Sequence, residues 1–325
     1  MQSRSFAQSK PVPGTPPSAF SHSTAVSTLR AYYELAKPGI VYGNAISALG
    51  GFFLASHGAL MLPTLAAMLA GLSLVVASGC VFNNYLDRDI DRLMLRTQER
   101  PLPRRAIAPR ASLVYATFLG LAGTLILARG TTPLATTMAL FGLFTYVILY
   151  TLLSKRRTPY ATHLGSIAGA MPPVVGYCAV TGRFDLAALI LFVMLCLWQM
   201  PHFFAIALFR RDDYAAAKIP VWPIVKSVRK TKEQIVLYVS AFAIVSVLLW
   251  PFGYTGIAYG LTAIVLGIGW IALSLRGFRG TDDATWAKRV FLFSLVILSV
   301  LCAGMALDAR PPTVHAPIRY VPAFV

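Results

Sequence analysis

Residues 62–92 read LPTLAAMLAGLSLVVASGCVFNNYLDRDIDR, and this stretch decides the fold class. Up to residue 84 it is mostly apolar and as long as a helix that crosses a bilayer, which needs about 20 residues. A membrane-spanning β-strand would be about half that length and would alternate polar with apolar side chains. The stretch therefore predicts a transmembrane helix that ends in a charged segment at the membrane boundary.

The same pattern of apolar segment and polar loop recurs along the chain. Of the 325 residues, 57% are hydrophobic and 13% are charged, and the mean hydropathy is +0.65. Because a soluble domain averages about 25% charged residues, this composition excludes an ordinary soluble protein, a disordered chain and a coiled coil. We predict an all-α polytopic membrane protein. Its nine predicted transmembrane helices are residues 39–57, 62–84, 111–128, 134–153, 161–180, 187–208, 234–252, 256–275 and 290–307.

Basic residues are distributed unevenly over the two ends of these helices. The chain carries 29 Lys and Arg against 12 Asp and Glu, a formal net charge of +17. With the N-terminus in the cytoplasm, 25 of the 29 basic residues fall on the cytoplasmic side, as the positive-inside rule requires. The charge therefore predicts a cytoplasmic N-terminus, a periplasmic C-terminus and a lipid bilayer as partner, and it requires no nucleic acid.

The two ends of the chain differ from the predicted membrane domain at residues 31–308. Residues 1–30 are rich in Ser and Pro and hold no acidic residue, which is typical of a disordered cytoplasmic tail or of an organellar transit peptide. Because basic residues are few there, we favour the tail, and with it a bacterial inner membrane over a mitochondrial one. Residues 309–325 are predicted to be a short periplasmic tail.

The polar end of the second predicted helix carries a candidate metal site. Asn83, Asp87 and Asp91 are four residues apart, so a continuing helix places them along one face. Mg²⁺ prefers one or two carboxylates together with waters and substrate phosphates. The spacing therefore indicates a Mg²⁺–diphosphate site. A solvated helix end held by Asp–Arg pairs is the alternative.

Further charged groups lie in loops on the same predicted side. Asp212 and Asp213 follow the sixth predicted helix, and a basic cluster follows the fourth. A metal-bound polyanion needs this mixture of carboxylates for the metal and basic side chains for the phosphate oxygens. Charged surface loops and membrane anchoring are the alternative interpretation. The basic candidates for phosphate binding are Arg88, Arg92, Lys155 and Arg156.

Polar residues at membrane depth form another candidate group. Gln199 and His202 lie within the sixth predicted helix and Asn44 within the first, and intramembrane polar residues mark functional sites by default. Interhelical hydrogen bonding is the alternative role. We predict that these three residues, with Tyr150 near the end of the fourth helix, contact the substrate. The fifth predicted helix is broken by Pro172 and Pro173.

Four segments of the chain together resemble the haem-prenylating branch of the UbiA-type intramembrane prenyltransferases. The resemblance runs from about Tyr33 to Trp286, and the Asn-x3-Asp-x3-Asp pattern is shared by the whole family. The segments are VASGCVFNNYLDRDIDRLMLRTQERPL, KRRTPYATHLGSIAGAMPPVVGYCAVTG, LWQMPHFFAIALFRRDDY and IPVWPIVK.

The resemblance implies a nine-helix UbiA-type fold around a central cavity that opens towards lipid. It implies Mg²⁺-dependent transfer of the farnesyl group of farnesyl diphosphate to the 2-vinyl group of haem B, with water addition. The products would be haem O and diphosphate. Haem O serves terminal oxidases directly or as the precursor of haem A, so haem A synthase or terminal oxidase assembly are implied partners.

Residue roles follow from the same resemblance. Asn83, Asp87 and Asp91 match the first aspartate motif, and Lys155 and Arg156 match the basic motif after the fourth helix. His202 becomes a candidate for haem contact or ligation.

The second aspartate motif departs from the family pattern. It is commonly Asp-x3-Asp, but Ala217 stands where its second acid would be. The sequence therefore leaves open whether Asp212 or Asp213 faces the metal, and we count Asp213 among the candidate ligands.

Two other functions compete with haem prenylation. The acceptor of the same family chemistry could be a quinone precursor or another ring, against which the haem-branch segments and His202 argue. A membrane transporter would bind its substrate at the midplane between repeat-related broken helices. The acidic residues cluster at the predicted cytoplasmic boundary instead, which favours an enzyme that acts on a diphosphate.

Overall fold

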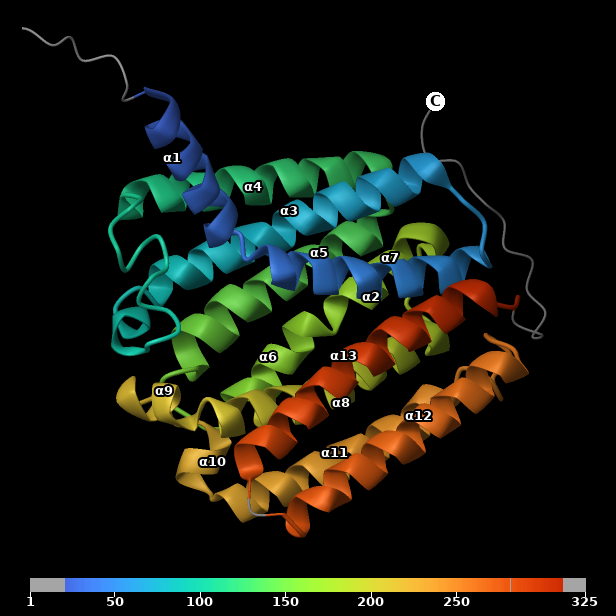
Figure 1. The fold of residues 1–325 in the computed structure, drawn as a ribbon. Helices are drawn as coiled ribbons and strands as arrows, with labels where there is room; N and C mark the ends of the chain where they lie inside the picture. The colour runs from blue at the N-terminus through green and yellow to red at the C-terminus, as the bar shows by residue number, and fades with distance from the viewer. Residues whose placement is uncertain (1–20, 281, 312–325) are drawn as a thin grey trace, which may run out of the picture.

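The computed structural model describes residues 21–280 and 282–311, which form a bundle of helices joined by loops (Figure 1). It confirms the all-α fold, and each predicted span overlaps a helix or a pair of helices. The elements, in order, are α1 (Ser21–Leu35), α2 (Pro38–Ser56), α3 (Leu62–Leu86), a 3₁₀ turn (Ile90–Leu93), α4 (Pro109–Gly130), α5 (Pro133–Phe144), a π-helix (Thr145–Ser154), α6 (Ala161–Gly169), α7 (Met171–Thr181), α8 (Leu186–Phe209), α9 (Arg211–Ala216), α10 (Trp222–Val225), α11 (Val228–Val247), α12 (Ile257–Leu275), a 3₁₀ turn (Arg276–Phe278) and α13 (Asp283–Leu307).

Eight spans in the described part of the chain are long and apolar enough to cross a membrane. The remaining predicted span corresponds to α11, whose first two turns carry Arg229, Lys230, Lys232 and Glu233. Because of these charges, α11 is not one of the eight apolar spans, although its later turns are apolar. The nine-helix prediction and the structure therefore differ only in how this one helix is classed.

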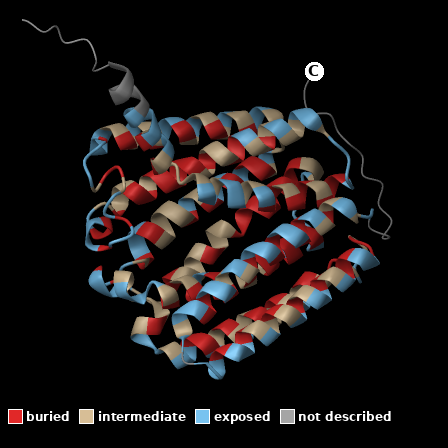
Figure 2. Ribbon diagram, viewed as in Figure 1, coloured by how far each residue is buried: buried red, intermediate tan, exposed pale blue. Residues whose placement is uncertain are grey.

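Close backbone contacts hold the middle of the bundle together. A methyl group added at Gly51 of α2 would lie 2.0 Å from the carbonyl oxygen of Pro173 in α7. One added at Gly176 of α7 would lie 2.0 Å from the carbonyl oxygen of Ala48 in α2. Glycine therefore allows these two helices to touch along their backbones, as small residues do in membrane bundles. Buried residues line the inward faces of the helices (Figure 2).

Two spans are irregular, and both irregularities face the interior. The predicted break in the fifth span is present: α6 ends at Gly169 and α7 begins at Met171, where Pro172 and Pro173 supply no backbone N–H donors. The fourth span changes from an α-helix to a π-helix at Thr145, which the sequence did not predict. Broken or widened helices at membrane depth are tolerated where protein or a cavity surrounds them.

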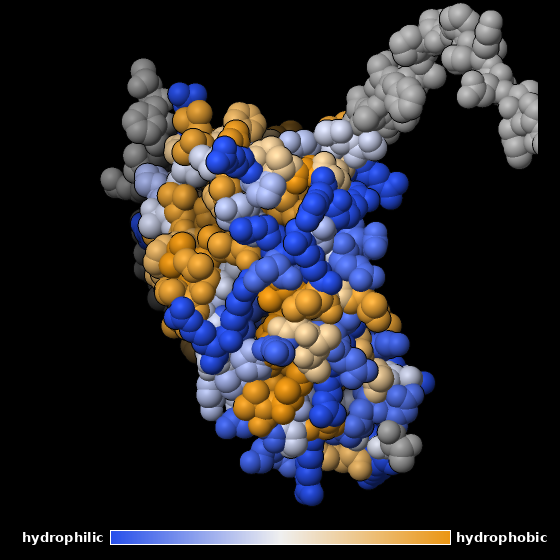
Figure 3. Space-filling view, turned by 90° about the vertical axis from the view of Figure 1, so that its left-hand side faces the viewer, coloured by the Kyte–Doolittle hydropathy of each residue, from blue (hydrophilic) through white to orange (hydrophobic). Residues whose placement is uncertain are grey.

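The longest loops gather at one end of the bundle, on the left in Figure 1. Hydrophilic side chains gather over this end (Figure 3). Ile90 and Met94, after α3, pack there against Ala217 and Ile219, after α9. The two acidic loops, far apart in sequence, are thus joined by an apolar cluster. α2 begins at this loop end and α13 finishes at the opposite end, as an odd number of crossings requires.

The termini only partly fall within the described residues. The segment predicted as a disordered tail ends at residue 30, but α1 already begins at Ser21. Ala31 and Leu35 on this helix are buried in an apolar cluster with residues of α3 and α4, which explains why the helix forms. Residues 1–20 and 312–325 of the two predicted tails lie outside the described residues.

Candidate functional site

Asn83, Asp87 and Asp91 lie together where α3 ends. The helix stops at Leu86, but the N–H of Asp87 donates to the carbonyl of Asn83 at 2.9 Å, and the N–H of Asp91 donates to that of Asp87 at 2.8 Å. The Asn83 amide donates to Asp87 Oδ2 at 2.8 Å. All three side chains are buried, and both aspartates are only 1% exposed. The structure therefore brings the three residues onto one face.

A basic side chain donates to each of these buried groups. Lys155 donates to Asp87 Oδ2, and the Arg100 guanidinium donates to both carboxylate oxygens of Asp91 at 3.0 and 2.8 Å. Lys37 donates to Asn83 Oδ1. Removing one member of such a buried pair is destabilising, because it leaves an uncompensated charge.

Lys37 reaches the cluster from a strained position just before α2. Its backbone is left-handed, with φ at 51°, directly ahead of Pro38. Burial, followed by repulsion from the Arg100 guanidinium, lowers the pKa of Lys37 to about 8. A second arginine of the loop, Arg96, also has a lowered pKa because it is partly buried near Arg100. The loop end of the cavity is therefore crowded with positive charge.

Arg156 connects this cluster to the protein surface. Its guanidinium donates to both oxygens of Asp89 at 2.6 and 2.7 Å and to the carbonyl of Leu86 at 2.7 Å. The hydrogen bond from Arg156 lowers the pKa of Asp89 to about 2. Arg156 Nη2 also lies 3.7 Å from Asp87 Oδ1, so this side chain is within reach of the buried carboxylate.

Arg88 and Arg92 lie elsewhere. Arg88 sits over the ring of Tyr85 and donates to the Tyr85 carbonyl, and both arginines line a small polar depression with Leu86 and Asp89. They are not among the residues that line the main cavity. Their assignment to phosphate binding rested on proximity in the sequence, whereas Arg88 is held at Tyr85.

The second acidic pair lies on α9, at the same end of the bundle. Asp213 is half-buried, with Arg210 Nη1 4.0 Å from its carboxylate, whereas Asp212 is exposed. Of the two, Asp213 faces inward, which bears on the choice the sequence left open. No group of three or more His, Cys, Asp or Glu side chains in the described residues is close enough to hold a metal, so Asp213 is not gathered with Asp87 and Asp91.

A cavity of about 610 Å³ lies inside the bundle next to these charges. Lys155 and Tyr214 belong to its lining, so the Lys155 ammonium touches both the cavity and Asp87. Most of the lining is apolar. It includes Leu72, Val75, Val76, Ala139, Leu143 and Leu298. A largely apolar chamber with a few polar groups and one charged end suits an amphiphilic ligand with an anionic head.

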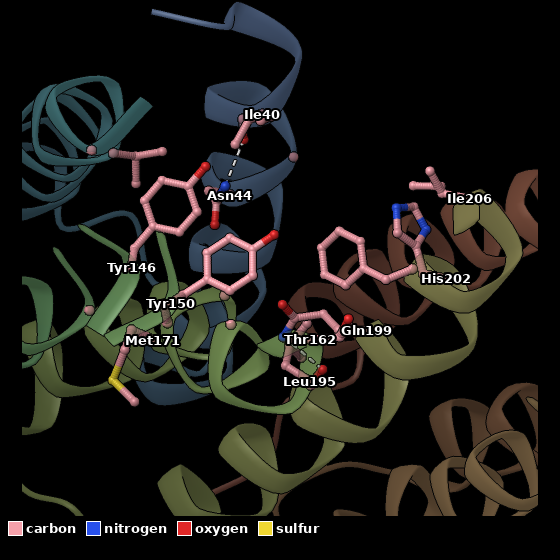
Figure 4. A pocket seen from close by; sticks show the side chains of 18 of the residues that line it. Ile40, Asn44, Tyr146, Tyr150, Thr162, Met171, Leu195, Gln199, His202 and Ile206 are labelled. Carbon is pink, nitrogen blue, oxygen red and sulfur yellow. Dashed lines mark hydrogen bonds between the residues drawn. The ribbon is translucent and has the colours of Figure 1, made fainter. Parts of the chain in front are cut away.

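The π-helix directs two tyrosines into this space, and Lys155 follows its last residue. Tyr146 and Tyr150 stack with ring centroids 5.7 Å apart and point into the cavity (Figure 4). The N–H of Lys155 donates to the carbonyl of Tyr150, five residues earlier, at 2.9 Å. In an α-helix residues five apart diverge by about 140°, whereas this wider bonding keeps Tyr150 and Lys155 on nearly the same side.

The predicted intramembrane polar residues all line the cavity. Asn44 donates to the carbonyl of Ile40 in its own helix at 2.7 Å (Figure 4). Gln199 donates to the carbonyls of Ser166 and Leu195 at 3.0 and 2.9 Å, so its amide group bridges α8 and the broken fifth span. His202 lies across the cavity from the two tyrosines (Figure 4).

The donor set beside Asp87 fits a divalent cation that binds together with a diphosphate. Asp87 Oδ1 is buried and has no hydrogen-bond partner. With Asp91 and the Asn83 amide oxygen, it offers two carboxylates and one neutral oxygen, a set that suits Mg²⁺ when phosphate and water complete the shell. The residues present therefore fit the predicted metal.

Lys37 and Arg100 belong to the site but were not predicted from the sequence. Arg100 stands within the segment RTQERPL, which carried part of the family resemblance, and that was an available signal. Lys37 is 46 residues from Asn83, and only the packing of α2 beside α3 brings them together.

Comparison with known proteins gives consistent results. The family model described as "UbiA prenyltransferase family" matches residues 44–296. A protein of Yersinia enterocolitica named Protoheme IX farnesyltransferase is 48% identical over 293 residues, which cover 90% of this chain and 99% of that protein. A protein of Klebsiella pneumoniae with the same name is 49% identical over 290 residues, with coverage of 89% and 98%.

Solved structures agree on the fold. A structure of digeranylgeranylglyceryl phosphate synthase matches with a TM-score of 0.72 at 19% identity, covering 86% of this chain and 98% of that one. A UbiA homologue from Archaeoglobus fulgidus bound to DMAPP and Mg²⁺ matches with a TM-score of 0.62 at 14% identity, covering 83% and 99%.

Proposed function

The chain belongs to the UbiA prenyltransferase family, and we propose that it transfers the farnesyl group of farnesyl diphosphate to the 2-vinyl group of haem B. It is an enzyme and an integral membrane protein of this family. The proposed products are haem O and diphosphate. The identity of 48–49% to relatives named Protoheme IX farnesyltransferase supports haem as the acceptor.

The observation that carries this proposal is the pair of buried aspartates next to a largely apolar cavity. Asp87 and Asp91 are 1% exposed, and Lys155 joins Asp87 to the cavity lining. A prenyl diphosphate has a matching division into a polyanionic head and an apolar tail. The head would lie at the charged end and the tail among the aliphatic side chains.

The chain's own cations prepare the head-group end. Lys155, Arg156, Arg100 and Lys37 now contact oxygens of the acidic cluster. Arriving phosphate oxygens would take over part of these charge-assisted hydrogen bonds. Asp87, Asp91 and Asn83 would hold Mg²⁺, and the bound ion would neutralise the negative charge that develops on the leaving group.

The bond changes follow from the allylic substrate. The C–O bond to diphosphate breaks, and the allylic carbon forms a bond to the terminal carbon of the vinyl group. Water adds at the inner vinyl carbon, and its proton leaves with the diphosphate or to solvent. The apolar walls exclude bulk water, which would otherwise capture the farnesyl cation first. The cavity thus protects the reactive carbon until the acceptor has attacked.

Haem extraction tests the function directly. The gene would be expressed in a bacterial strain that lacks its own haem O synthase, and the extracted haems would be separated by chromatography. We expect haem O to accumulate. Its absence, with the protein present in the membrane, would overturn the proposal.

Purified protein would test the acceptor. Incubation with farnesyl diphosphate, Mg²⁺ and either haem B or an aromatic quinone precursor is expected to prenylate haem only. Prenylation of the quinone precursor alone would place the chain elsewhere in its family.

A further inference from the structure

His202 occupies a rigid position on the wall of the cavity. It lies on α8, is 9% exposed and is held between two aromatic rings. Trp198 stacks on it with ring centroids 4.7 Å apart, and the ring of Phe291 from α13 lies 4.7 Å from it. Trp198 is itself fixed, because its indole N–H donates to the carbonyl of Ser294 at 2.9 Å. The imidazole therefore has little freedom to turn.

The hydrogen bonds around Ser294 bear on which nitrogen of His202 carries the proton. His202 Nδ1 lies 2.8 Å from Ser294 Oγ. The hydroxyl of Ser294 has one proton, and it donates that proton to the carbonyl of Phe291 at 2.6 Å. Because Ser294 is fully buried, the contact with His202 is satisfied only if Nδ1 is the donor. We assign the proton to Nδ1 on the basis of these two contacts, which leaves a lone pair on Nε2.

Nε2 takes part in none of the hydrogen bonds of the described residues, and His202 lines the cavity. A neutral imidazole whose Nδ1–H is tied to an oxygen is the form in which histidine binds metals, because the second hydrogen bond fixes the ring and its tautomer. Tyr146 and Tyr150 lie across the cavity from His202 (Figure 4). Three aromatic rings lie around the His202 ring, those of Trp198, Phe203 and Phe291.

We propose that His202 Nε2 binds the iron of the acceptor haem as an axial ligand and thereby orients the macrocycle in the cavity. This inference rests on the proposed function, because it takes haem as the acceptor. In this arrangement Ser294 is a positioning residue that acts through His202. The flat macrocycle would lie against the wall formed by α8 and α13. The prenyl tail would lie against the aliphatic side chains of α3 and α5.

Absorption spectra of the detergent-purified full chain test the ligand. Ferric haem B would be titrated into wild type, His202→Ala, Ser294→Ala and His163→Ala, and metal-free protoporphyrin IX would be titrated in parallel. His163 is the matched control, since it is a half-buried helical histidine, it shares a hydrogen bond with Tyr238, and it does not line the cavity.

We expect wild type and His163→Ala to show a histidine-ligated haem spectrum. His202→Ala should lose it, and added imidazole should restore it. Ser294→Ala should bind ferric haem about 10- to 100-fold more weakly. Wild type and His202→Ala should bind metal-free protoporphyrin equally, because no iron is present to ligate.

Two results would overturn the proposal. One is a His202→Ala spectrum and haem affinity equal to wild type. The other is an equal loss of haem and protoporphyrin binding in that variant, which would make His202 a packing residue only. Failure of the proposed function is distinguishable, because wild type would then show the histidine-ligated spectrum yet form no haem O from farnesyl diphosphate.

Discussion

Single residues offer the sharpest test of the acidic cluster. Asp87→Asn keeps the shape of the side chain but removes a charge that faces Lys155. We expect haem O formation to fall at least about 100-fold, because electrostatic stabilisation of the leaving group is lost. Asp91→Asn should behave alike. Chromatography of extracted haems gives the rate, and an immunoblot of membranes confirms that the protein is present.

Asp89 provides the control for this prediction. Its side chain is 61% exposed and pairs with Arg156 on the outer surface, although it stands between the two buried acids in the sequence. Asp89→Asn should retain nearly the wild-type rate. Equal losses in all three variants would show that charge in the loop, rather than the buried face, is what matters.

Lys155 should affect binding of the diphosphate more than the later steps. A charge-assisted hydrogen bond contributes about 1.5–3 kcal/mol, so Lys155→Ala should raise KM for farnesyl diphosphate roughly 10- to 100-fold. Arg157→Ala is the control, because Arg157 is exposed and does not line the cavity. Steady-state kinetics with varied farnesyl diphosphate measure both. An unchanged KM in Lys155→Ala would remove this residue from the head-group site.

Among single residues, the sequence pointed to those of the acidic cluster that are close to one another in the chain, namely Asn83, Asp87 and Asp91. The Asn-x3-Asp-x3-Asp pattern was sufficient because backbone hydrogen bonds four residues apart continue past the end of α3. Lys37 and Arg100 were missed, since tertiary packing rather than spacing brings them to the cluster. Arg88 was assigned to substrate by proximity in sequence, whereas the structure turns it towards Tyr85.

At the scale of the helices, the packing of α2 against α7 requires a close backbone contact. A substitution at Gly176 tests this contact. A methyl group there would lie 2.0 Å from the carbonyl of Ala48, and neither backbone can yield without separating the helices. Overpacking of this kind costs about 1–3 kcal/mol. We expect Gly176→Ala to lower the thermal midpoint of the detergent-purified protein, followed by circular dichroism.

Gly280→Ala is the matched substitution, because a methyl group at that position meets no atom within 4 Å. It should leave the midpoint unchanged. If both variants melt at the wild-type temperature, the contact between α2 and α7 is looser than the structure indicates.

The helices themselves were largely predictable, and the departures have physical causes. Apolar length marks a span wherever charges stop at its ends, as in α3 and α8. α11 is harder to place because its first turns are charged. The π-helix at Thr145–Ser154 has no sequence signal, since the same apolar residues would form an α-helix equally well. It matters because it sets the directions of Tyr150 and Lys155.

At the scale of the whole molecule, charged residues gather at one end of the bundle. Figure 3 shows many hydrophilic side chains over this loop end. Part of the +17 charge faces the acidic cluster and belongs to the proposed diphosphate site. The remainder agrees with an orientation in which this end is cytoplasmic, because basic loops resist translocation. Substrate diphosphate would then reach the enzyme from the cytoplasm, and haem from the bilayer or its inner face.

Reporter fusions would test this orientation. Alkaline phosphatase is active only after export, so a fusion after Arg310, beyond α13, should be active, and so should one after Gly130, between α4 and α5. Fusions after Arg105 and after Gly280 lie at the loop end and should be inactive, while fluorescent-protein fusions at the same four positions should give the reverse pattern. The expectation follows from the 25 of 29 basic residues that the sequence predicts on the cytoplasmic side. Active phosphatase at Arg105 together with inactive enzyme at Arg310 would invert the molecule and place the aspartate cluster on the periplasmic side.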